Sequence, residues 1–283
     1  MTINLAEAWA KYYWAKTHLQ RIDGELWVWS KRYTGTMPFG IKREIRGDDG
    51  CVVFRVSRVD RTAASWPLII GDALVNFMAT LDYLAWQLVG AGHKPNPDRP
   101  NNVGFPIYTN KNSLNGAMGQ KLPGVVYKRY CAIILRHQPY RGSPPENHPL
   151  AILKSLGGRD KHRQLQLVLL RHTEFSAELK TCVGIENPSL IGPISNTLLV
   201  QPDAELVRVY GKFTQAEPKV EVRFKGSTGV AFEDGRWVMP ALESIATEIK
   251  AILEEFEAVI AEDAARPHAP QPPIARPVPP STG

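Results

Sequence analysis

Thiols are scarce in this chain: Cys51, Cys131 and Cys182 are the three cysteines among 283 residues, and none of them belongs to a CxxC pair. This spacing argues against a disulfide framework and against a thiolate zinc site, and it favours a reducing compartment. Common catalytic motifs are missing as well, because the chain has no GxxxxGK[ST], no strand-linked GxGxxG, no HExxH and no GxSxG. P-loop hydrolysis, Rossmann redox chemistry and zincin proteolysis are therefore poorly supported. We expect neither a cofactor nor a metal.

Targeting signals are also lacking, because the chain opens with an amphipathic pattern rather than a basic n-region followed by an apolar h-region. The longest apolar stretch, residues 66–92, has the length of a membrane span but contains Asp72 and Asp82. An acid near the centre of a span costs roughly 2.5–3.5 kcal/mol on insertion. We therefore interpret this stretch as a core helix and predict a cytoplasmic protein with no membrane partner.

Charge is distributed unevenly along the chain. Residues 101–172 hold eleven Lys and Arg against two acids, a formal charge of +9, whereas residues 241–263 hold seven acids against Lys250, a formal charge of −6. A field of this kind can steer a polyanion toward the middle of the chain. The alternative is that the acidic segment packs beside the basic one and the two charges cancel.

Hydrophobic periodicity predicts an α+β fold. Helical spacing runs through residues 4–29, 69–89 and 241–264, and shorter helices are expected within 124–135 and from residue 148 to Gly157–Gly158. Segments 41–46 and 51–59 flank the turn GDDG and predict a hairpin, the FPI run at 105–107 an extended segment, and 165–170 a strand or helix. From residue 197 on, four segments alternate in period two, as antiparallel strands do. We predict one domain over residues 1–265, in which a helical layer covers an antiparallel sheet built mostly from 198–238 and the hairpin, followed by a disordered proline-rich tail at 266–283.

A thin polar seam marks the predicted helix at 69–89. Asp72, Asn76, Thr80, Tyr83 and Gln87 fall within one narrow arc of a helix that is otherwise apolar. Because a helix apolar on most of its surface should be buried, and buried polar groups need partners, the seam is either a hydrogen-bond ladder or the floor of a site. In the structural interpretation Asp72 caps the first turn, and Asn76 and Tyr83 bond to a neighbouring helix. In the functional one, Asp72, Asn76 and Tyr83 bind a ligand.

The densest cluster of chemically active side chains is RDKHR at 159–163. In metal-free RNA cleavage His162 would transfer protons, Lys161 and Arg163 would stabilise charge on the phosphorane-like state, and Asp160 would orient the histidine. Arg159, together with Lys128 and Arg129, would contact phosphates. The alternative is a solvated turn whose charges form surface ion pairs of small energetic value.

Five short motifs carry a resemblance to known proteins: GDALVNFMATLDYLAW (71–86), FPI (105–107), QPY (138–140), HPL (148–150) and DKHR (160–163). In this order they resemble a family of uncharacterised bacterial and phage proteins over residues 1–172. In many of these relatives the first motif reads closer to GDxLHNLRSALDHLxW, and its Arg–four residues–His spacing is similar to the signature of the HEPN helical-bundle ribonucleases. That resemblance implies a dimer in which paired Arg and His residues cleave RNA without metal. In this chain the Arg position is Met78 and the His position is Tyr83, so the resemblance implies a lost catalytic site: methionine carries no charge, and a phenol with a pKa near ~10 shuttles protons poorly.

Three hypotheses for function follow from the sequence. The first is a non-catalytic, HEPN-like binding or regulatory protein that contacts RNA or another polyanion through residues 101–172, with a homodimer as its expected assembly. The second is a metal-independent ribonuclease that uses His162 with Lys161 and Arg163. The third is a phage-type interaction module that engages a protein partner through the last helix or the proline-rich tail. We rank the enzyme last.

Overall fold

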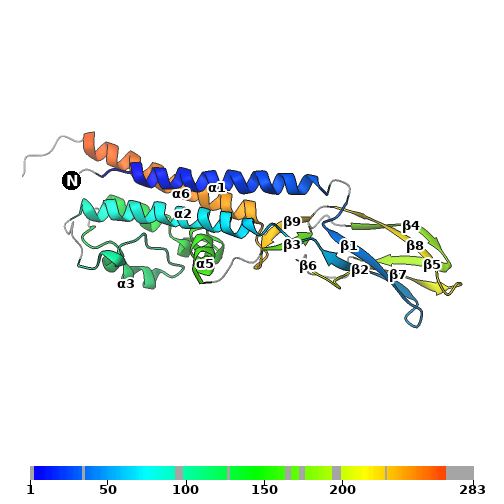
Figure 1. Ribbon diagram of the computed structural model, residues 1–283. Helices are drawn as coiled ribbons and strands as arrows, with labels where there is room; N and C mark the ends of the chain where they lie inside the picture. The colour runs from blue at the N-terminus through cyan, green and yellow to red at the C-terminus, as the bar shows by residue number, and fades with distance from the viewer. Residues whose placement is uncertain are drawn as a thin grey trace, which may run out of the picture.

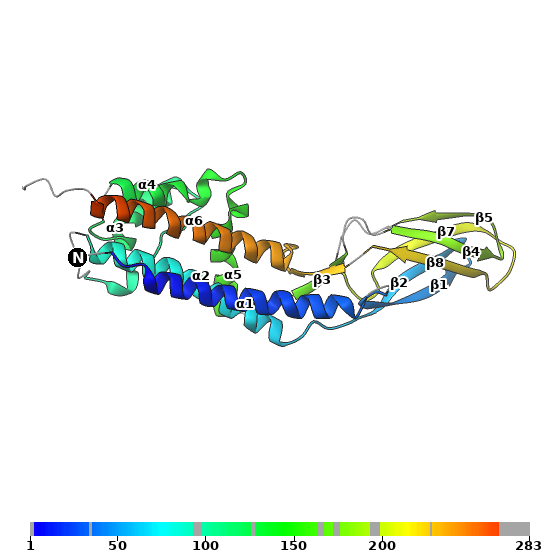
Figure 2. The ribbon, with the colours of Figure 1, turned by 90° about the horizontal axis from the view of Figure 1, so that it is seen from above.

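The computed structural model describes residues 3–33, 36–92, 98–125, 128–162, 167–171, 176–192, 199–226 and 228–265. These residues form six α-helices and nine β-strands, which confirms the predicted α+β class. The helices gather at one end of an elongated molecule and most of the strands at the other (Figure 1, Figure 2). The predicted tail at 266–283 lies outside the described residues, and the single-domain arrangement stays a prediction.

Three long helices run side by side and form the frame of the helical end (Figure 1, Figure 2). They are α1 (Ala6–Lys31), α2 (Ser65–Gly90) and α6 (Val238–Ala265). The apolar stripe predicted for the first helix is the buried face of α1, since Ala8, Tyr12, Ala15, Leu19 and Ile22 are all buried. The near-heptad apolar positions of α6 are buried in the same way, from Leu242 to Phe256. Hydrogen bonds connect the three helices: Trp66 Nε1 of α2 donates to Glu25 Oε2 of α1 at 2.9 Å, and Trp9 Nε1 of α1 donates to Glu257 of α6.

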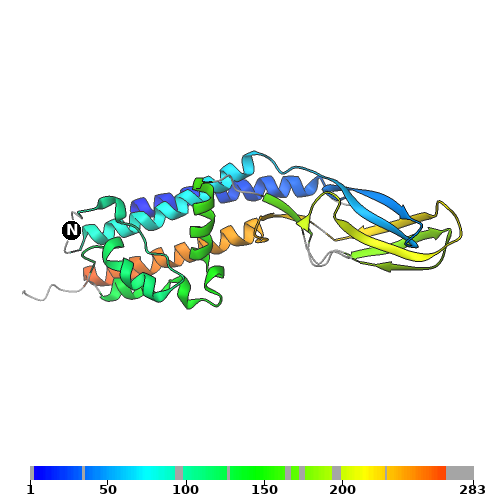
Figure 3. The same ribbon diagram turned by 90° about the horizontal axis from the view of Figure 1, so that it is seen from below.

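Three shorter helices fill the space beside this frame: α3 (Lys111–Lys121), α4 (Lys128–Arg136) and α5 (Pro149–His162). Three single 3-10 turns accompany them: η1 (Pro100–Asn102) precedes α3, and η2 (Pro139–Arg141) and η3 (Pro145–Asn147) lie between α4 and α5. The sequence pattern did not predict α3, whose first turn is capped by Asn110 Oδ1 accepting from the N–H groups of Asn112 and Ser113. It was wrong about α5, because the helix continues through Gly157–Gly158 to His162 and crosses the long helices steeply (Figure 3).

All strand pairs described are antiparallel, but they form three sheets rather than the predicted one. The four-stranded sheet has the order β1-β2-β7-β5, the three-stranded sheet β6-β3-β9, and the two-stranded sheet β4-β8. The bounds are β1 (Phe39–Arg46), β2 (Cys51–Val59), β3 (Leu167–Arg171), β4 (Ser176–Val183), β5 (Ile185–Ile191), β6 (Leu199–Val200), β7 (Glu205–Phe213), β8 (Lys219–Lys225) and β9 (Thr228–Phe232). The β1–β2 hairpin confirms its prediction, and Gly50, at φ +62°, donates its N–H to the carbonyl of Gly47 to close the turn. Strands β4 and β5 were not predicted, and the ambiguous run at 165–170 contains a strand, β3.

Two hydrophobic clusters stabilise the protein. The larger one fills the helical end and reaches the three-stranded sheet through Leu169, Val200 and Phe232. The smaller one lies between the four-stranded sheet and the β4–β8 pair, around Val52, Phe54, Ile185, Val207, Val209 and Val220. Strand β2 joins them, because Val56 belongs to the larger cluster and Val52 to the smaller.

Within the described chain, α2 is the one helix with the length and apolar composition to cross a membrane, and 56% of its most apolar stretch is buried in the protein. A core helix satisfies the same criteria. The predicted location of the protein is not decided by this observation.

Candidate ligand-binding cavity

The FPI segment, residues 105–108, lies outside every helix and strand and is held by side chains from three elements. Asp82 Oδ1 of α2 accepts the Phe105 N–H at 3.1 Å. Gln138, just after α4, accepts the Tyr108 N–H with Oε1 at 3.1 Å and donates from Nε2 to the Pro106 carbonyl at 2.8 Å. Lys154 Nζ of α5 donates to the Ile107 carbonyl at 2.7 Å. These side chains therefore bond backbone N–H and C=O groups of the segment that a neighbouring strand would bond in a sheet.

A cavity of about 410 Å³, which we call the FPI cavity, opens beside this segment. Four groups of residues line it: Leu74, Val75, Met78 and Asp82 from α2; Asn101, Val103 and 104–108 from the connection; Lys121 from α3; and Lys154, Gly157 and Gly158 from α5. The two glycines of α5 face open space, because a Cβ built on either one meets nothing within 4 Å. A volume of several hundred Å³ with a few polar groups in an apolar wall is typical of a site for a small ligand.

The charges in the FPI cavity are predominantly positive. Lys121 and Lys154 both line it, and the structure records no ion pair between either lysine and any described acid. Burial lowers the pKa of the Lys154 ammonium below its usual range, and the nearby charge of Lys121 lowers it further. The one acid of the lining, Asp82, accepts the Phe105 N–H, and its carboxylate lies near Lys121, because a Cβ built on Gly104 would stand 2.9 Å from Asp82 Oδ1 and 4.0 Å from Lys121 Nζ. Two ammonium groups that repel one another across a cavity make a favourable environment for an anion.

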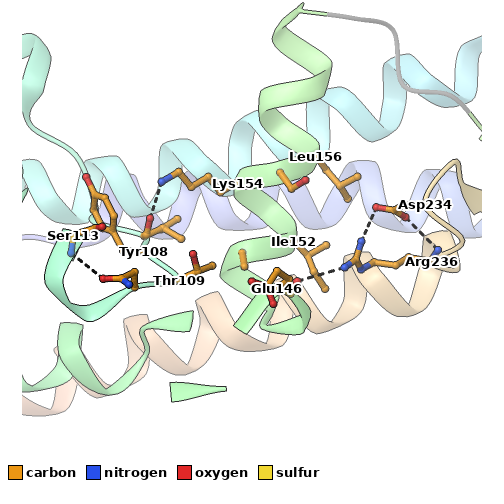
Figure 4. A pocket seen from close by; sticks show the side chains of 13 residues that line it. Tyr108, Thr109, Ser113, Glu146, Ile152, Lys154, Leu156, Asp234 and Arg236 are labelled. Atoms are coloured by element: carbon orange, nitrogen blue, oxygen red, sulfur yellow. Dashed lines mark hydrogen bonds and ion pairs between the residues drawn. The ribbon is translucent and has the colours of Figure 1, made fainter. Parts of the chain in front are cut away.

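A second cavity of about 340 Å³ adjoins the first on the other side of Lys154 and is named the Arg236 cavity. Ile107, Tyr108 and Lys154 line both cavities. At its far end Arg236 forms an ion pair with Asp234 at 2.6 Å and donates to the Glu146 carbonyl (Figure 4). Lys154 reaches from α5 toward Tyr108 at the opposite end, and its Nζ lies 4.6 Å from the centre of the Tyr108 ring (Figure 4).

The polar seam of α2 is not the buried ladder that the sequence suggested. Asp72 and Tyr83 are exposed, whereas Thr80 is buried. Asn76 Nδ2 and Thr80 Oγ1 donate to carbonyls one turn earlier in α2 itself, at 2.8 and 2.9 Å, rather than to a neighbouring helix. Because α2 begins at Ser65, Asp72 stands inside the helix and does not cap it.

The seam residues do not gather at the cavity. The ring of Tyr83 lies 6.0 Å from Lys11 Nζ of α1, and none of Asp72, Asn76 and Tyr83 is among the described residues that line either cavity. Of the two positions that the HEPN resemblance assigns to catalysis, Met78 lines the FPI cavity and Tyr83 lies against α1 instead. Helical spacing explains this separation, since residues five apart point about 140° away from each other.

The basic cluster at 159–163 begins where the cavity wall ends. Arg159, Asp160, Lys161 and His162 are the last four residues of α5 and directly follow Gly158 of the lining. The orientations of their side chains, and Arg163 altogether, lie outside the described part of the chain. The structure therefore places the backbone of residues 159–162 at one end of the FPI cavity.

Two arginines of the remaining basic segment pair with the acidic last helix, so the second interpretation of the charge pattern holds for this part of the segment. Arg129 of α4 pairs with Glu262 and Asp263 of α6, and Arg136 pairs with Glu255 at 2.9 Å. Lys128, the other predicted binding residue of α4, is exposed.

Buried His137 completes this interface, with Nδ1 2.8 Å from Glu248 and Nε2 3.2 Å from Glu255. Burial alone would lower the pKa of His137, but the two carboxylates outweigh it and raise the pKa above its ordinary value. This histidine is thus also engaged inside the interface with α6.

No protein-family model matches the chain, and no curated protein or solved structure resembles it. The case for function is therefore made on the geometry of the cavity. Sequence reasoning singled out the FPI and QPY motifs without assigning them a site, and it missed Lys121 and Lys154 as a pair. The signal for that pair was weak, because the two lysines are 33 positions apart in the sequence and meet through the steep crossing of α5.

Proposed function

We propose that this protein is a non-catalytic binding or regulatory protein of HEPN-like ancestry that contacts RNA, or another polyanion, at the FPI cavity and the adjoining end of α5. The single observation that carries the proposal is that two lysines, Lys121 and Lys154, line one cavity with a single acid, Asp82, and that neither lysine forms an ion pair with a described acid. A phosphate group between them would relieve their mutual repulsion and satisfy part of their hydrogen-bonding capacity.

Two further observations support a polyanion over a single small anion as the principal ligand. Arg159, Lys161 and His162 follow the cavity wall in sequence, so cationic residues continue along α5 beyond Gly158. Two of the three cations of α4 are used elsewhere, because Arg129 and Arg136 pair with α6, whereas Lys128 is exposed. A chain of phosphates that starts in the FPI cavity and follows the last turn of α5 would therefore run along Arg159 and Lys161 of the basic segment.

The loss of catalysis in this proposal rests on the residues at the two HEPN positions. Met78 in the cavity wall can neither transfer a proton nor balance the charge of a phosphate. Tyr83 lies against Lys11, so these two positions do not converge on one ligand. We therefore expect RNA to be bound and released intact.

The test is the affinity of the full chain for a fluorescent single-stranded RNA, measured by anisotropy over a series of salt concentrations. We expect log Kd to rise linearly with log salt, because phosphate contacts release counterions. Lys121→Gln and Lys154→Gln should each weaken binding and reduce the slope by about one. Lys111→Gln removes the same charge from α3 outside both cavities, and it should leave affinity and slope nearly unchanged.

Any of the following results would overturn the proposal. Binding that is undetectable at low salt, or equally weakened by Lys111→Gln, removes the cavity as the contact site. Cleavage of the RNA in the presence of chelator, abolished by His162→Ala, would favour the metal-independent ribonuclease instead. A copurifying protein that binds through the proline-rich tail, without any RNA affinity, would favour the interaction module.

A further inference from the structure

Lys154 is the one described side chain with an amine that lines both cavities. Its Nζ donates to the Ile107 carbonyl at 2.7 Å and stands 4.6 Å from the centre of the Tyr108 ring. These two contacts hold the amine at the boundary between cavities of about 340 and 410 Å³. The side chain nevertheless remains accessible to solvent, so a ligand can reach it from either side.

The surroundings of this amine are those of a nucleophilic lysine. A lysine is activated when partial burial and a neighbouring cation disfavour its protonated form. Both conditions are met at Lys154, where burial and the charge of Lys121 lower the pKa of the ammonium. The neutral amine still has an N–H for the Ile107 carbonyl, and its lone pair is then free to attack.

We propose that Lys154 binds a small carbonyl compound covalently, as an imine, and that Lys121 holds an anionic group of the same ligand. The ligand class is an aldehyde or ketone that carries a phosphate or carboxylate. This inference rests on the proposed function in one respect, because both place a ligand in the FPI cavity. It adds that a small regulatory ligand competes with RNA for this cavity.

The chemistry requires no oxidant and no metal. The lone pair of the neutral Lys154 amine adds to the carbonyl carbon and forms the C–N bond. Both hydrogens of the amine leave with the carbonyl oxygen as one molecule of water, and a C=N bond remains. The step is reversible, so hydrolysis of the imine restores the free lysine and releases the ligand.

Three features of the two cavities suit such a ligand. Lys121 lies close to Gly104, which directly precedes the FPI segment, since a Cβ built on Gly104 would stand 4.0 Å from Lys121 Nζ. Leu74, Val75 and Met78 supply an apolar wall for the body of the ligand. The Arg236 cavity on the other side of Lys154 provides space for a substituent on the carbonyl carbon.

The probe is pyridoxal phosphate, which combines an aldehyde with a phosphate, and pyridoxal is its phosphate-free counterpart. The wild-type protein is treated with a limiting amount of either probe at neutral pH, the imine is reduced with borohydride, and labelled lysines are located by peptide mass spectrometry. We expect Lys154 to be labelled faster than the exposed Lys111, because its lowered pKa raises the fraction of free amine at neutral pH. Equal labelling of the two lysines in the wild-type protein overturns the inference without requiring any variant.

Variants separate the roles of the two lysines. Lys154→Arg keeps a donor for the Ile107 carbonyl and should abolish labelling at this position while the other lysines still react. Lys121→Gln should slow labelling by pyridoxal phosphate more than labelling by pyridoxal, and Lys121→Arg should restore the preference for the phosphate form. If the wild-type protein reacts equally fast with pyridoxal phosphate and with pyridoxal, Lys121 does not hold the anion.

Competition with RNA distinguishes this inference from the proposed function. Protection of Lys154 from the probe by single-stranded RNA supports both. Rapid labelling that RNA does not slow leaves the covalent site standing and removes the RNA contact. Tight RNA binding with a Lys154 that labels no faster than Lys111 removes the covalent site alone.

Discussion

At the scale of single residues, Gln138 controls the shape of the candidate site. This side chain is fully buried and bonds three backbone groups: it accepts from the Tyr108 N–H and donates to the carbonyls of Pro106 and Ile134. A primary amide can do this because it carries an acceptor and two donors on one rigid plane. Gln138 therefore acts in place of a neighbouring strand for the FPI segment.

Replacing Gln138 by leucine should destabilise the protein by about 3 kcal/mol. The two side chains are of similar size, so the loss comes mainly from buried backbone groups that lose their partner, at about 1–3 kcal/mol each. The measurement is the free energy of unfolding from urea denaturation. Gln120→Leu is the matched control, because Gln120 is exposed on α3 and its replacement should cost little. A Gln138→Leu variant as stable as the control would contradict the role of this amide.

At the scale of elements, the sequence pattern wrongly predicted that α5 ends at Gly157–Gly158, and the packing of this helix explains the error. Two adjacent glycines usually mark the end of a helix, since glycine loses more conformational entropy on folding than any other residue. Here α5 is held from outside: Leu150, Leu153 and Leu156 are buried in the main hydrophobic cluster, and Lys154 binds the FPI segment. Tertiary packing outweighs the low helix propensity of the two glycines, which costs about 1 kcal/mol per glycine relative to alanine.

Alanine at Gly158 tests this explanation. If α5 continues through this position, Gly158→Ala should raise the free energy of unfolding by about 1 kcal/mol, because alanine has the higher helix propensity and its Cβ meets nothing within 4 Å. Urea denaturation again provides the measurement. Gly184→Ala provides the opposite case, since Gly184 has φ +86° and a Cβ there would stand 2.9 Å from Gln215. Destabilisation by Gly158→Ala comparable to that of Gly184→Ala would show that the helix breaks where the sequence suggested.

The same contrast explains how much of the fold could be predicted from the sequence. Periodicity identified α1, α2, α6 and the β1–β2 hairpin, because each presents a continuous buried face to one partner. It missed β4 and β5, whose residues are mostly exposed or only partly buried and show no clear alternation. It also missed the FPI cavity, which depends on side-chain bonds between segments far apart in the chain rather than on any local pattern. The seam of α2 was misjudged because neighbouring helices cover only part of that helix, so Leu68, Val75 and Trp86 are exposed beside its polar residues.

At the scale of the whole molecule, the question is whether the strand end and the helical end unfold together. The chain passes between helices and strands at four places, from α1 to β1, from β2 to α2, from α5 to β3 and from β9 to α6. The two ends are also connected by packing, since Phe224 of β8 packs against both hydrophobic clusters and β2 contributes residues to each. Shared strands of this kind favour cooperative unfolding, as the predicted single domain requires.

Val207→Ala provides the test, because Val207 is fully buried in the smaller cluster at the strand end. Losing two buried carbons and leaving a small void should cost about 2 kcal/mol. Tryptophan fluorescence reports on the other end, since six of the seven tryptophans lie in α1 and α2 and Trp237 directly precedes α6. In a single cooperative unit, the variant lowers the urea midpoint seen by fluorescence as much as the one seen by circular dichroism. Val183→Ala, at a half-exposed position of β4, should move neither midpoint appreciably. If the fluorescence midpoint stays in place while the dichroism transition splits, the chain instead consists of two domains. The ligand cavity, with both of its lysines, then belongs to a helical domain that folds without the strand end.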